Sequence, residues 1–159
     1  IRSVMVRTHQ ASFRCDLLKE SKNKCMVTDI AEPSLLFASH IKPFSECEIE
    51  ESYDASNGLL LARNIDALFD LALISFDASN GKLICSPWIS KNLGILTLFG
   101  IQLNMHLHES FLKDPARRKY LSLHNKVTKE LRDVKKARSL WPILHGNFDK
   151  ISVEYFFSK

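Results

Sequence analysis

The sequence has little of what marks a membrane-spanning, secreted or zinc-binding protein. No apolar run approaches the roughly 20 residues that a membrane-spanning helix needs. No basic stretch followed by an apolar one opens the chain, so we expect no signal peptide and no membrane partner. The four cysteines are widely spaced and form no Cys-x-x-Cys pair, which argues against a structural zinc site and favours reduced thiols in a cytoplasm.

The five glycines and five prolines leave no low-complexity or linker-like stretch. With 159 residues, of which 45% are hydrophobic and 25% charged, the chain is long enough for one domain with a hydrophobic core. We expect this domain over residues 1–135, with its core at 25–78 and a C-terminal extension at 136–159. Because the first residue is Ile, we also expect the chain to be part of a longer protein.

The net charge of +4 suits a polyanionic partner without requiring one. Much of the positive charge lies in one short segment, residues 117–138. Two interpretations of this segment remain open, a solvated helix face and a surface that contacts phosphates. Its basic residues are Arg117, Arg118, Lys119, Lys126, Lys129, Arg132, Lys135, Lys136 and Arg138.

Apolar periodicity predicts one helix and three strands in the first part of the chain. Residues 9–20 have helical spacing. The apolar runs at 25–28 and 35–40 are short, and turn-forming Asp, Pro and Ser residues separate them, so we expect two strands. After a polar, acidic loop, a third strand is expected at 58–61.

The second part of the chain is also mixed. Residues 63–72 have an apolar helical face, with Asn64 as the expected N-cap. An Asn-Gly pair at 80–81 between two apolar runs is a strong signal for a β-hairpin. A longer helix is expected from Pro115, and residues 151–157 are a candidate final strand. The predicted class is therefore α+β.

The window from residue 35 to 76 contains side chains suited to phosphodiester hydrolysis. His40 ends a predicted strand, Asn57 lies seventeen residues later, and Asp66 and Asp70 are one helical turn apart. A histidine, whose pKa lies near neutrality, can take a proton from an attacking water. Two carboxylates at i and i+4 can hold a hard cation such as Mg²⁺, which stabilises the leaving oxygen. Strand, loop, strand and helix around a histidine outline a ββα-metal hairpin.

Each of these residues also has an ordinary structural interpretation. A histidine after an apolar strand is more often structural than catalytic. An Asn before Gly commonly forms a turn, and an Asp pair on a helix is usually solvated. Their combination in this order and spacing is much more specific than any one of them.

In these residues the chain resembles the HNH endonuclease family, in the branch that contains restriction endonucleases and related nuclease domains. The resemblance covers roughly residues 7–126. It rests on Phe13-Arg14 with Leu17-Leu18, Cys25-Met26-Val27-Thr28, Ala38-Ser39-His40-Ile41-Lys42-Pro43, Asn57-Gly58-Leu59-Leu60-Leu61, Asp66-Ala67-Leu68-Phe69-Asp70, Leu73-Ile74-Ser75-Phe76 and, more loosely, Arg118-Lys119-Tyr120-Leu121 with His124.

The resemblance implies a ββα-metal (HNH, or His-Me finger) nuclease core with flanking helices and an added β-hairpin. It makes His40 the general base, and Asn57 the residue that orients that base or braces the hairpin loop. It makes Asp66 the metal ligand and Asp70 a second ligand on the same helix. The implied cofactor is one divalent cation per site, Mg²⁺ first, with Mn²⁺ and Ni²⁺ as alternatives.

The implied partner is double-stranded DNA, cut in a prokaryotic cytoplasm by a homodimer or in two sequential events. We expect the cleavage domain of a restriction enzyme, modification-dependent or not, with a target-recognition domain elsewhere in the parent chain. The alternatives are a non-specific antibacterial nuclease effector and a DNA-binding module of the same fold without hydrolysis. The residues expected to contact DNA are Lys42, Arg63, Arg117, Arg118 and Lys126.

Several positions depart from the family pattern. Many relatives carry Asp or His directly before the base, where this chain has Ser39. Asp70 or a loop carboxylate such as Asp54 would then have to complete the metal site. Asp29 and Ala72 stand where relatives have glycine.

Three further histidines have competing interpretations. His106 and His108 resemble a metal pair, although alternating exposure on an edge strand is the preferred interpretation. We expect His124, on the long helix, to be packed or solvated rather than to contact a phosphate.

Overall fold

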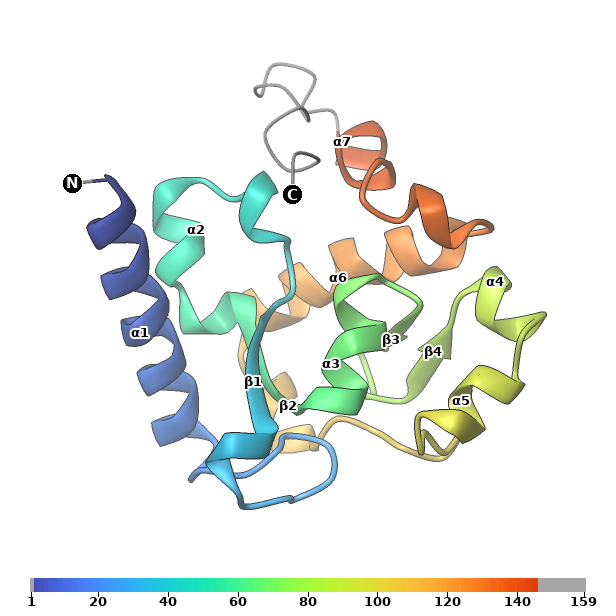
Figure 1. Cartoon of the computed structure of the whole chain (residues 1–159), viewed down its shortest axis with the longest axis horizontal. Helices are drawn as coiled ribbons and strands as arrows, with labels where there is room; N and C mark the ends of the chain where they lie inside the picture. Colours follow the sequence, from blue (N-terminus) through green and yellow to red (C-terminus); the bar gives the residue numbers. More distant parts are fainter. Residues whose placement is uncertain (1, 146–159) are drawn as a thin grey trace.

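Two small antiparallel hairpins lie at the centre of the molecule, with helices around them (Figure 1). The computed structural model describes residues 2–145, so the candidate strand at 151–157 lies outside the described residues. Within the described part the mixed α+β class is confirmed. The helices and strands are α1 (Arg2–Glu20), β1 (Leu36–His40), α2 (Ile49–Tyr53), β2 (Gly58–Ala62), α3 (Arg63–Asp70), β3 (Ile74–Phe76), β4 (Leu83–Cys85), α4 (Pro87–Ser90), α5 (Gly94–Leu98), α6 (Pro115–Glu130) and α7 (Leu140–His145).

The first helix, α1, extends the predicted helix at 9–20 toward the N-terminus. It ends where Asn23, with a φ of 60°, turns the backbone left-handed and donates its N–H to the Leu18 carbonyl. Phe13 is buried and packs on the start of β2. A Cβ at Gly58 would lie 2.5 Å from Phe13 Cζ, so this close approach requires glycine.

β1 and β2 pair so that Leu36 lies opposite Ala62 and His40 opposite Gly58. All five residues of β2 are buried, because α1 packs on this strand and α3 packs on the hairpin. A strand covered in this way needs a continuous apolar run rather than an alternating one, which explains the Leu-Leu-Leu sequence. The strands predicted at 35–40 and 58–61 are confirmed.

The strand predicted at 25–28 is wrong. This segment is a turn, closed by the Asp29 N–H on the Cys25 carbonyl at 3.2 Å, and Asp29 has a φ of 61°. Met26 still donates its N–H to the Leu60 carbonyl at 2.9 Å. The segment curls away after this bond, and within residues 2–145 the only ladder of β2 is with β1.

The helix predicted at 63–72 is confirmed as α3, but Asn64 is not its N-cap. β2 runs directly into α3, so the cap position falls on Ala62, whose side chain makes no capping hydrogen bond. Asn64 already lies in the first turn and donates its Nδ2 to the Phe99 carbonyl at 2.8 Å. The apolar face of α3 is buried as predicted, with Ile65 and Phe69 fully inaccessible.

The second hairpin, β3–β4, is confirmed with its turn at 78–81. The helix predicted from Pro115 is confirmed as α6, which packs on β3, on β4 and on the 3₁₀ turn Ala55–Asn57 just before β2 (Figure 1). α6 therefore joins the two hairpins. None of the helices in residues 2–145 is long and apolar enough to cross a membrane.

Candidate active site

His40 ends β1 with its imidazole held on two sides. Its ring stacks on Phe13 of α1, with centroids 4.0 Å apart and planes 3° apart. Phe44 adds an edge contact at 5.7 Å. Nε2 lies 3.0 Å from the Ser52 carbonyl oxygen in α2. The imidazole therefore has one fixed orientation, set by three segments of the chain.

The Ser52 carbonyl also fixes the tautomer of His40. A carbonyl oxygen only accepts, so in the neutral ring Nε2 carries the proton and Nδ1 presents a lone pair. No hydrogen bond from the described residues reaches that Nδ1. Burial lowers the pKa of His40 below its ordinary value, against smaller opposing effects of the Ser52 carbonyl and the Asp70 charge. The ring is consequently neutral at pH 7 and able to accept a proton.

Asn57 is fully buried and braces the loop between β1 and β2. Its Oδ1 accepts the Lys42 N–H at 2.8 Å, and its Nδ2 donates to the Glu51 carbonyl at 3.1 Å. The same Nδ2 lies 3.3 Å from Cys47 Sγ. Of the two roles that the resemblance offered for Asn57, these contacts fit bracing the loop. The loop includes Ser52, which holds His40, so the bracing reaches the base indirectly.

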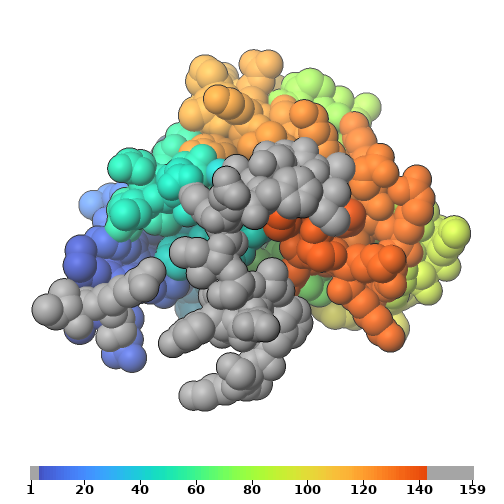
Figure 2. All heavy atoms as spheres, turned by 90° about the horizontal axis from the view of Figure 1, so that it is seen from above, coloured from blue at the N-terminus to red at the C-terminus, as the bar shows by residue number. Residues whose placement is uncertain are grey.

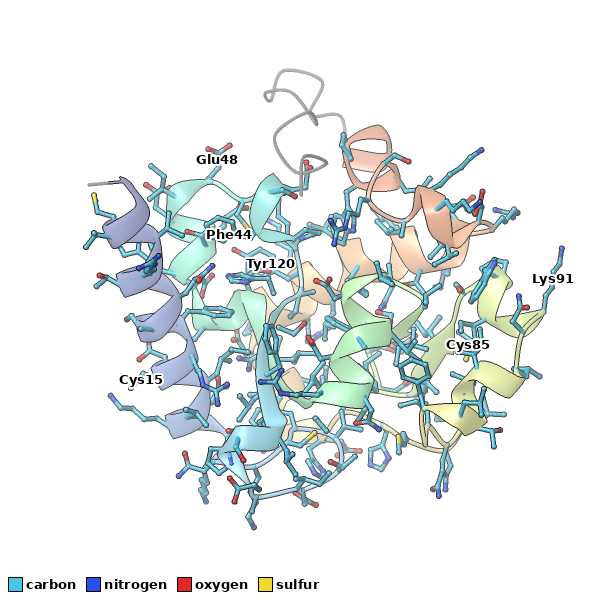
Figure 3. All side chains as sticks on the ribbon, viewed as in Figure 1. Cys15, Phe44, Glu48, Cys85, Lys91 and Tyr120 are labelled. Carbon is cyan, nitrogen blue, oxygen red and sulfur yellow. The ribbon has the colours of Figure 1, made fainter. Side chains whose placement is uncertain are left out.

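The loop containing α2 lies between α1 and α6, as the teal atoms between the blue and the orange ones indicate in Figure 2. Tyr120 of α6 reaches this loop (Figure 3) and donates its hydroxyl to Asp54 Oδ2 at 3.3 Å. Asp54 Oδ1 caps the following 3₁₀ turn by accepting the Ser56 N–H. Both oxygens of Asp54 are therefore occupied, which does not fit the role of additional metal ligand considered for it.

Asp66, on α3, lies near Ser39 of β1, and each side chain has one buried oxygen without a hydrogen-bond partner among the described residues. Asp66 Oδ1 and Ser39 Oγ are buried and have no hydrogen bond of good geometry to any described residue. Burial raises the pKa of Asp66, and the charge of Asp70 adds to this effect. The nearby Ser39 hydroxyl and the Arg63 charge act in the opposite direction. A buried carboxylate in this condition is a ready acceptor for a cation.

The residues present fit a divalent cation that keeps several water ligands. Asp70 is exposed and its charge acts on both His40 and Asp66, so these groups share one locality. Within residues 2–145, however, no three His, Cys, Asp or Glu side chains converge closely enough to enclose a metal ion. Mg²⁺ is commonly held by one or two carboxylates with water completing its shell, which suits this arrangement.

Arg117, expected to contact DNA, has a different place. Its side chain is 1% exposed and forms a two-pronged ion pair with Glu20, at 2.7 and 2.8 Å. It also donates to the carbonyls of Ala55 and Gly58. A guanidinium with these partners cannot reach a phosphate, so we correct this prediction and assign Arg117 to the interior.

The other predicted DNA contacts differ in their availability. Lys42 pairs with Glu51 at 2.6 Å and would have to leave it to bind a phosphate. Arg63 is exposed on α3 and lies over the Phe37 ring, 5.8 Å from its centroid. Arg118 is exposed and helps to line a shallow hollow of about 380 Å³ on α6. Lys126 is exposed on the same helix.

The other three histidines considered, His106, His108 and His124, form no metal site within residues 2–145. His108 lies 3.1 Å from Asp29 Oδ1, and His106 is exposed, so the two do not form a metal pair with a third ligand in the described part of the chain. The preferred edge-strand interpretation is only partly met, because His106 makes a single bridge to Lys82. His124 is buried, as expected for a packed residue.

Sequence reasoning missed three parts of the site: the stacking role of Phe13, the carbonyl of Ser52 and the buried role of Arg117. A backbone carbonyl leaves no signal in a sequence. The packing of Phe13 does leave a signal in the sequence. The aromatic ring lies so close to β2 that position 58 must be a glycine.

Comparisons with known proteins bear on the central part of this site. The sequence model of the HNH endonuclease family matches residues 25–77, about a third of the chain. The matched segment includes His40, Asn57, Asp66 and Asp70, and excludes α1 and α6. A comparison with curated proteins gave no significant match.

Proposed function

We propose that the chain is a DNA endonuclease domain that depends on a divalent metal ion, a proposal supported by the match of residues 25–77 to the HNH endonuclease family model. His40 is its general base, and Asp66 with Asp70 its metal ligands. One observation carries this proposal: the charge of Asp70 acts both on an oriented imidazole and on a carboxylate with a buried, unpartnered oxygen, so the three groups lie near one another.

The chain's own residues supply the proton transfer. With Nε2–H held by the Ser52 carbonyl, Nδ1 of His40 is the nitrogen that accepts a proton from a water attacking phosphorus. Stacking on Phe13 prevents the ring from rotating away and excludes water from one face. Asn57 keeps the loop that carries Ser52 closed and so maintains this orientation.

Asp66 and Asp70 would hold the divalent cation, which when bound neutralises phosphate charge and stabilises the leaving oxygen. Ser39 contributes a hydroxyl beside Asp66 where many relatives have a charged ligand. With two carboxylates and no third charged ligand near them in residues 2–145, we propose Mg²⁺ as the working ion, with Mn²⁺ and Ni²⁺ as substitutes.

The proposed substrate is double-stranded DNA, contacted through Arg63, Arg118 and Lys126. All three are exposed, and none has a carboxylate partner among the described ion pairs. The mild positive net charge supports this proposal. The resemblance to restriction endonucleases supports the role of a cleavage domain in a prokaryotic restriction system, acting in the cytoplasm as a homodimer or beside a target-recognition domain.

The test is cleavage of supercoiled plasmid by the purified chain with Mg²⁺, Mn²⁺ or Ni²⁺, and with EDTA as the control. We expect nicked and then linear DNA with metal, and none with EDTA. A wild-type chain that binds the metal but leaves DNA intact refutes hydrolysis and favours a DNA-binding module.

A second digestion, with methylated and unmethylated DNA and the parent-length protein, tests the biological role. Defined fragments support a restriction enzyme, and their dependence on methylation reveals modification dependence. A smear of all sizes contradicts the restriction role and favours a non-specific nuclease effector.

A further inference from the structure

Two of the buried polar side chains of α6, Arg117 and His124, lie on one face, seven residues apart, and each one bonds to a different half of the candidate site. Arg117 is 1% exposed and His124 is 2% exposed. Two turns of helix separate them, so they project from the same side of α6. Neither residue lies in the segment that matches the HNH family.

Arg117 bonds to the backbone on both sides of Asn57. Its Nη2 donates to the Ala55 carbonyl at 2.9 Å, and its Nε donates to the Gly58 carbonyl at 3.1 Å. Glu20 accepts hydrogen bonds from both terminal nitrogens of Arg117 and keeps the guanidinium in place. Such a two-pronged pair fixes the plane as well as the position of the guanidinium. These bonds hold the backbone in place on both sides of Asn57.

His124 bonds to the end of the helix that carries the two aspartates. Its Nε2 donates to the Phe69 carbonyl at 3.0 Å, next to Asp70 in the chain. The Ser75 hydroxyl, 2.8 Å away, donates to Nδ1 and so selects this tautomer. The ring also stacks on the Phe69 side chain at 4.1 Å and 8°. The last turn of α3 is therefore fixed from both its backbone and its side chain.

We propose that α6 is part of the catalytic unit, with Arg117 positioning the Asn57 loop that supports His40 and His124 positioning the helix that presents Asp66 and Asp70. Neither residue is a metal ligand or a base, and each acts through another. The inference rests on the proposed nuclease function. It implies that the matched segment, residues 25–77, is an incomplete unit without the helix that joins its two halves.

Substituting the two positioning residues should impair different quantities, metal affinity in one case and cleavage rate in the other. A purely structural role would not separate the two. Loosening α3 should weaken metal binding, because the spacing of the two carboxylates is then no longer fixed. Loosening the Asn57 loop should slow the proton transfer with metal binding unchanged. Outer groups that orient ligands typically change metal affinity or activity by about 10- to 100-fold.

The experiment uses the full chain with two substitutions, His124→Phe and Arg117→Lys. His124→Phe keeps the stacking and removes both hydrogen bonds, while Arg117→Lys keeps the charge and removes the fork. Mn²⁺ affinity is measured by calorimetry, and kcat on plasmid DNA at saturating Mn²⁺. Ser122→Ala is the matched control, because this exposed hydroxyl bonds only within α6, to the Arg118 carbonyl.

We expect His124→Phe to weaken Mn²⁺ binding at least about tenfold with kcat little changed at saturation. We expect Arg117→Lys to lower kcat at least about tenfold with wild-type Mn²⁺ affinity. His124→Gln, which can still donate toward Phe69, should partly restore affinity. Equal effects of the two variants on both quantities, or effects no larger than in Ser122→Ala, overturn the proposal.

Two further measurements keep the inference separate from the proposed function and from folding. If the wild-type chain does not cut DNA, the nuclease proposal fails, and Mn²⁺ affinity still tests His124. Exchange of the Lys42 amide hydrogen, which bonds to Asn57 Oδ1, then tests Arg117 and should accelerate in Arg117→Lys. If Arg117→Lys does not fold, Glu20→Gln provides a second test, because it weakens the ion pair that holds Arg117. We expect it to lower kcat with wild-type Mn²⁺ affinity. A wild-type kcat and a wild-type exchange rate in Glu20→Gln refute the role of Arg117.

Discussion

The two sides of the candidate site are built in opposite ways. On the side of His40, the imidazole and the Asn57 side-chain amide each form hydrogen bonds to the loop backbone. On the side of Asp66, a carboxylate oxygen and the Ser39 hydroxyl are buried and unbonded within the described residues. An unbonded buried polar atom costs roughly 1–3 kcal/mol, so the fold stabilises one side and carries a cost on the other.

This difference indicates which further group each side could bind. In the proposed mechanism, His40 needs no further group to orient it, and the attacking water is its remaining partner. On the acidic side, a bound cation would offset the cost of burying these oxygens.

Removing the base should have the largest effect. General bases contribute roughly 10²–10⁴-fold to rate, so His40→Ala should slow plasmid cleavage by about that factor. Binding of DNA and of Mn²⁺ should be nearly unchanged, because neither depends on the imidazole. Cleavage rates and a gel-shift titration on the same preparation check both statements. A His40→Ala variant that cuts at the wild-type rate excludes His40 as the base.

One substitution on each side should show that the two sides contribute differently to stability. Asn57→Ala leaves several buried loop groups without partners and should lower the free energy of unfolding by about 3 kcal/mol. Asp66→Asn removes a charge whose burial already raises its pKa, so it should leave stability unchanged or raise it by about 1 kcal/mol. Urea unfolding at pH 7 with EDTA measures both. A loss in Asp66→Asn as large as in Asn57→Ala would remove the contrast.

The pH dependence of stability should reveal His124. Burial lowers the pKa of His124 from 6.5 to about 4, so the folded chain binds fewer protons than the unfolded chain between these values. The stabilisation is complete above pH 6.5 and is lost as the pH falls toward 4, at up to about 1.4 kcal/mol per pH unit. Comparison of urea unfolding in the wild type and in His124→Gln isolates this slope from the carboxylates. Parallel curves for the two proteins would contradict it.

The decline of the cleavage rate at acidic pH should follow the protonation of His40, the proposed base. Because burial lowers the pKa of His40 below 6.5, the neutral form persists into mildly acidic solution. The cleavage rate at saturating metal should therefore stay level near pH 7 and decline only below pH 6.5. A pH–rate profile measured between pH 5 and 8 checks this expectation. A rate that falls already between pH 8 and 7 would indicate a base with a raised pKa.

A small gain in stability is expected next to α3. Ala72 follows this helix with a φ of 54°, a left-handed conformation that costs a residue with a Cβ about 1 kcal/mol. Ala72→Gly should raise the free energy of unfolding by up to about this amount. Asp29→Gly is the matched comparison, because Asp tolerates this conformation better and Asp29 also contacts His108. A larger gain at Asp29 than at Ala72 would contradict the explanation.

Much of the central fold follows from local sequence. The strands at β1 and β2, the helix α3 and the Asn-Gly hairpin are each specified by apolar patterning or turn chemistry over a few residues. The segment at 25–28 misleads, because four apolar residues suggest a strand and the left-handed Asp29 closes them into a turn. The two positions where relatives have glycine, 29 and 72, both have left-handed backbones here.

The candidate site was only partly predictable, for a physical reason. The base and the two aspartates can be found from their order and spacing. Several groups that hold them come from α1 and α6, far away in the chain: Phe13 stacks on His40, and Arg117 and His124 donate to backbone carbonyls. Arg117 shows the limit clearly, because its sequence context is basic and exposed in character while its guanidinium is buried against Glu20.

The most direct test of the contrast is Mn²⁺ binding, measured by titration calorimetry on the wild type, His40→Ala and Asp66→Asn. We predict one ion per wild-type chain, the same affinity in His40→Ala, and no measurable binding in Asp66→Asn. If Asp66→Asn binds Mn²⁺ as tightly as the wild type does, the ion is held elsewhere, and the unpartnered carboxylate is not the metal-binding half of the site.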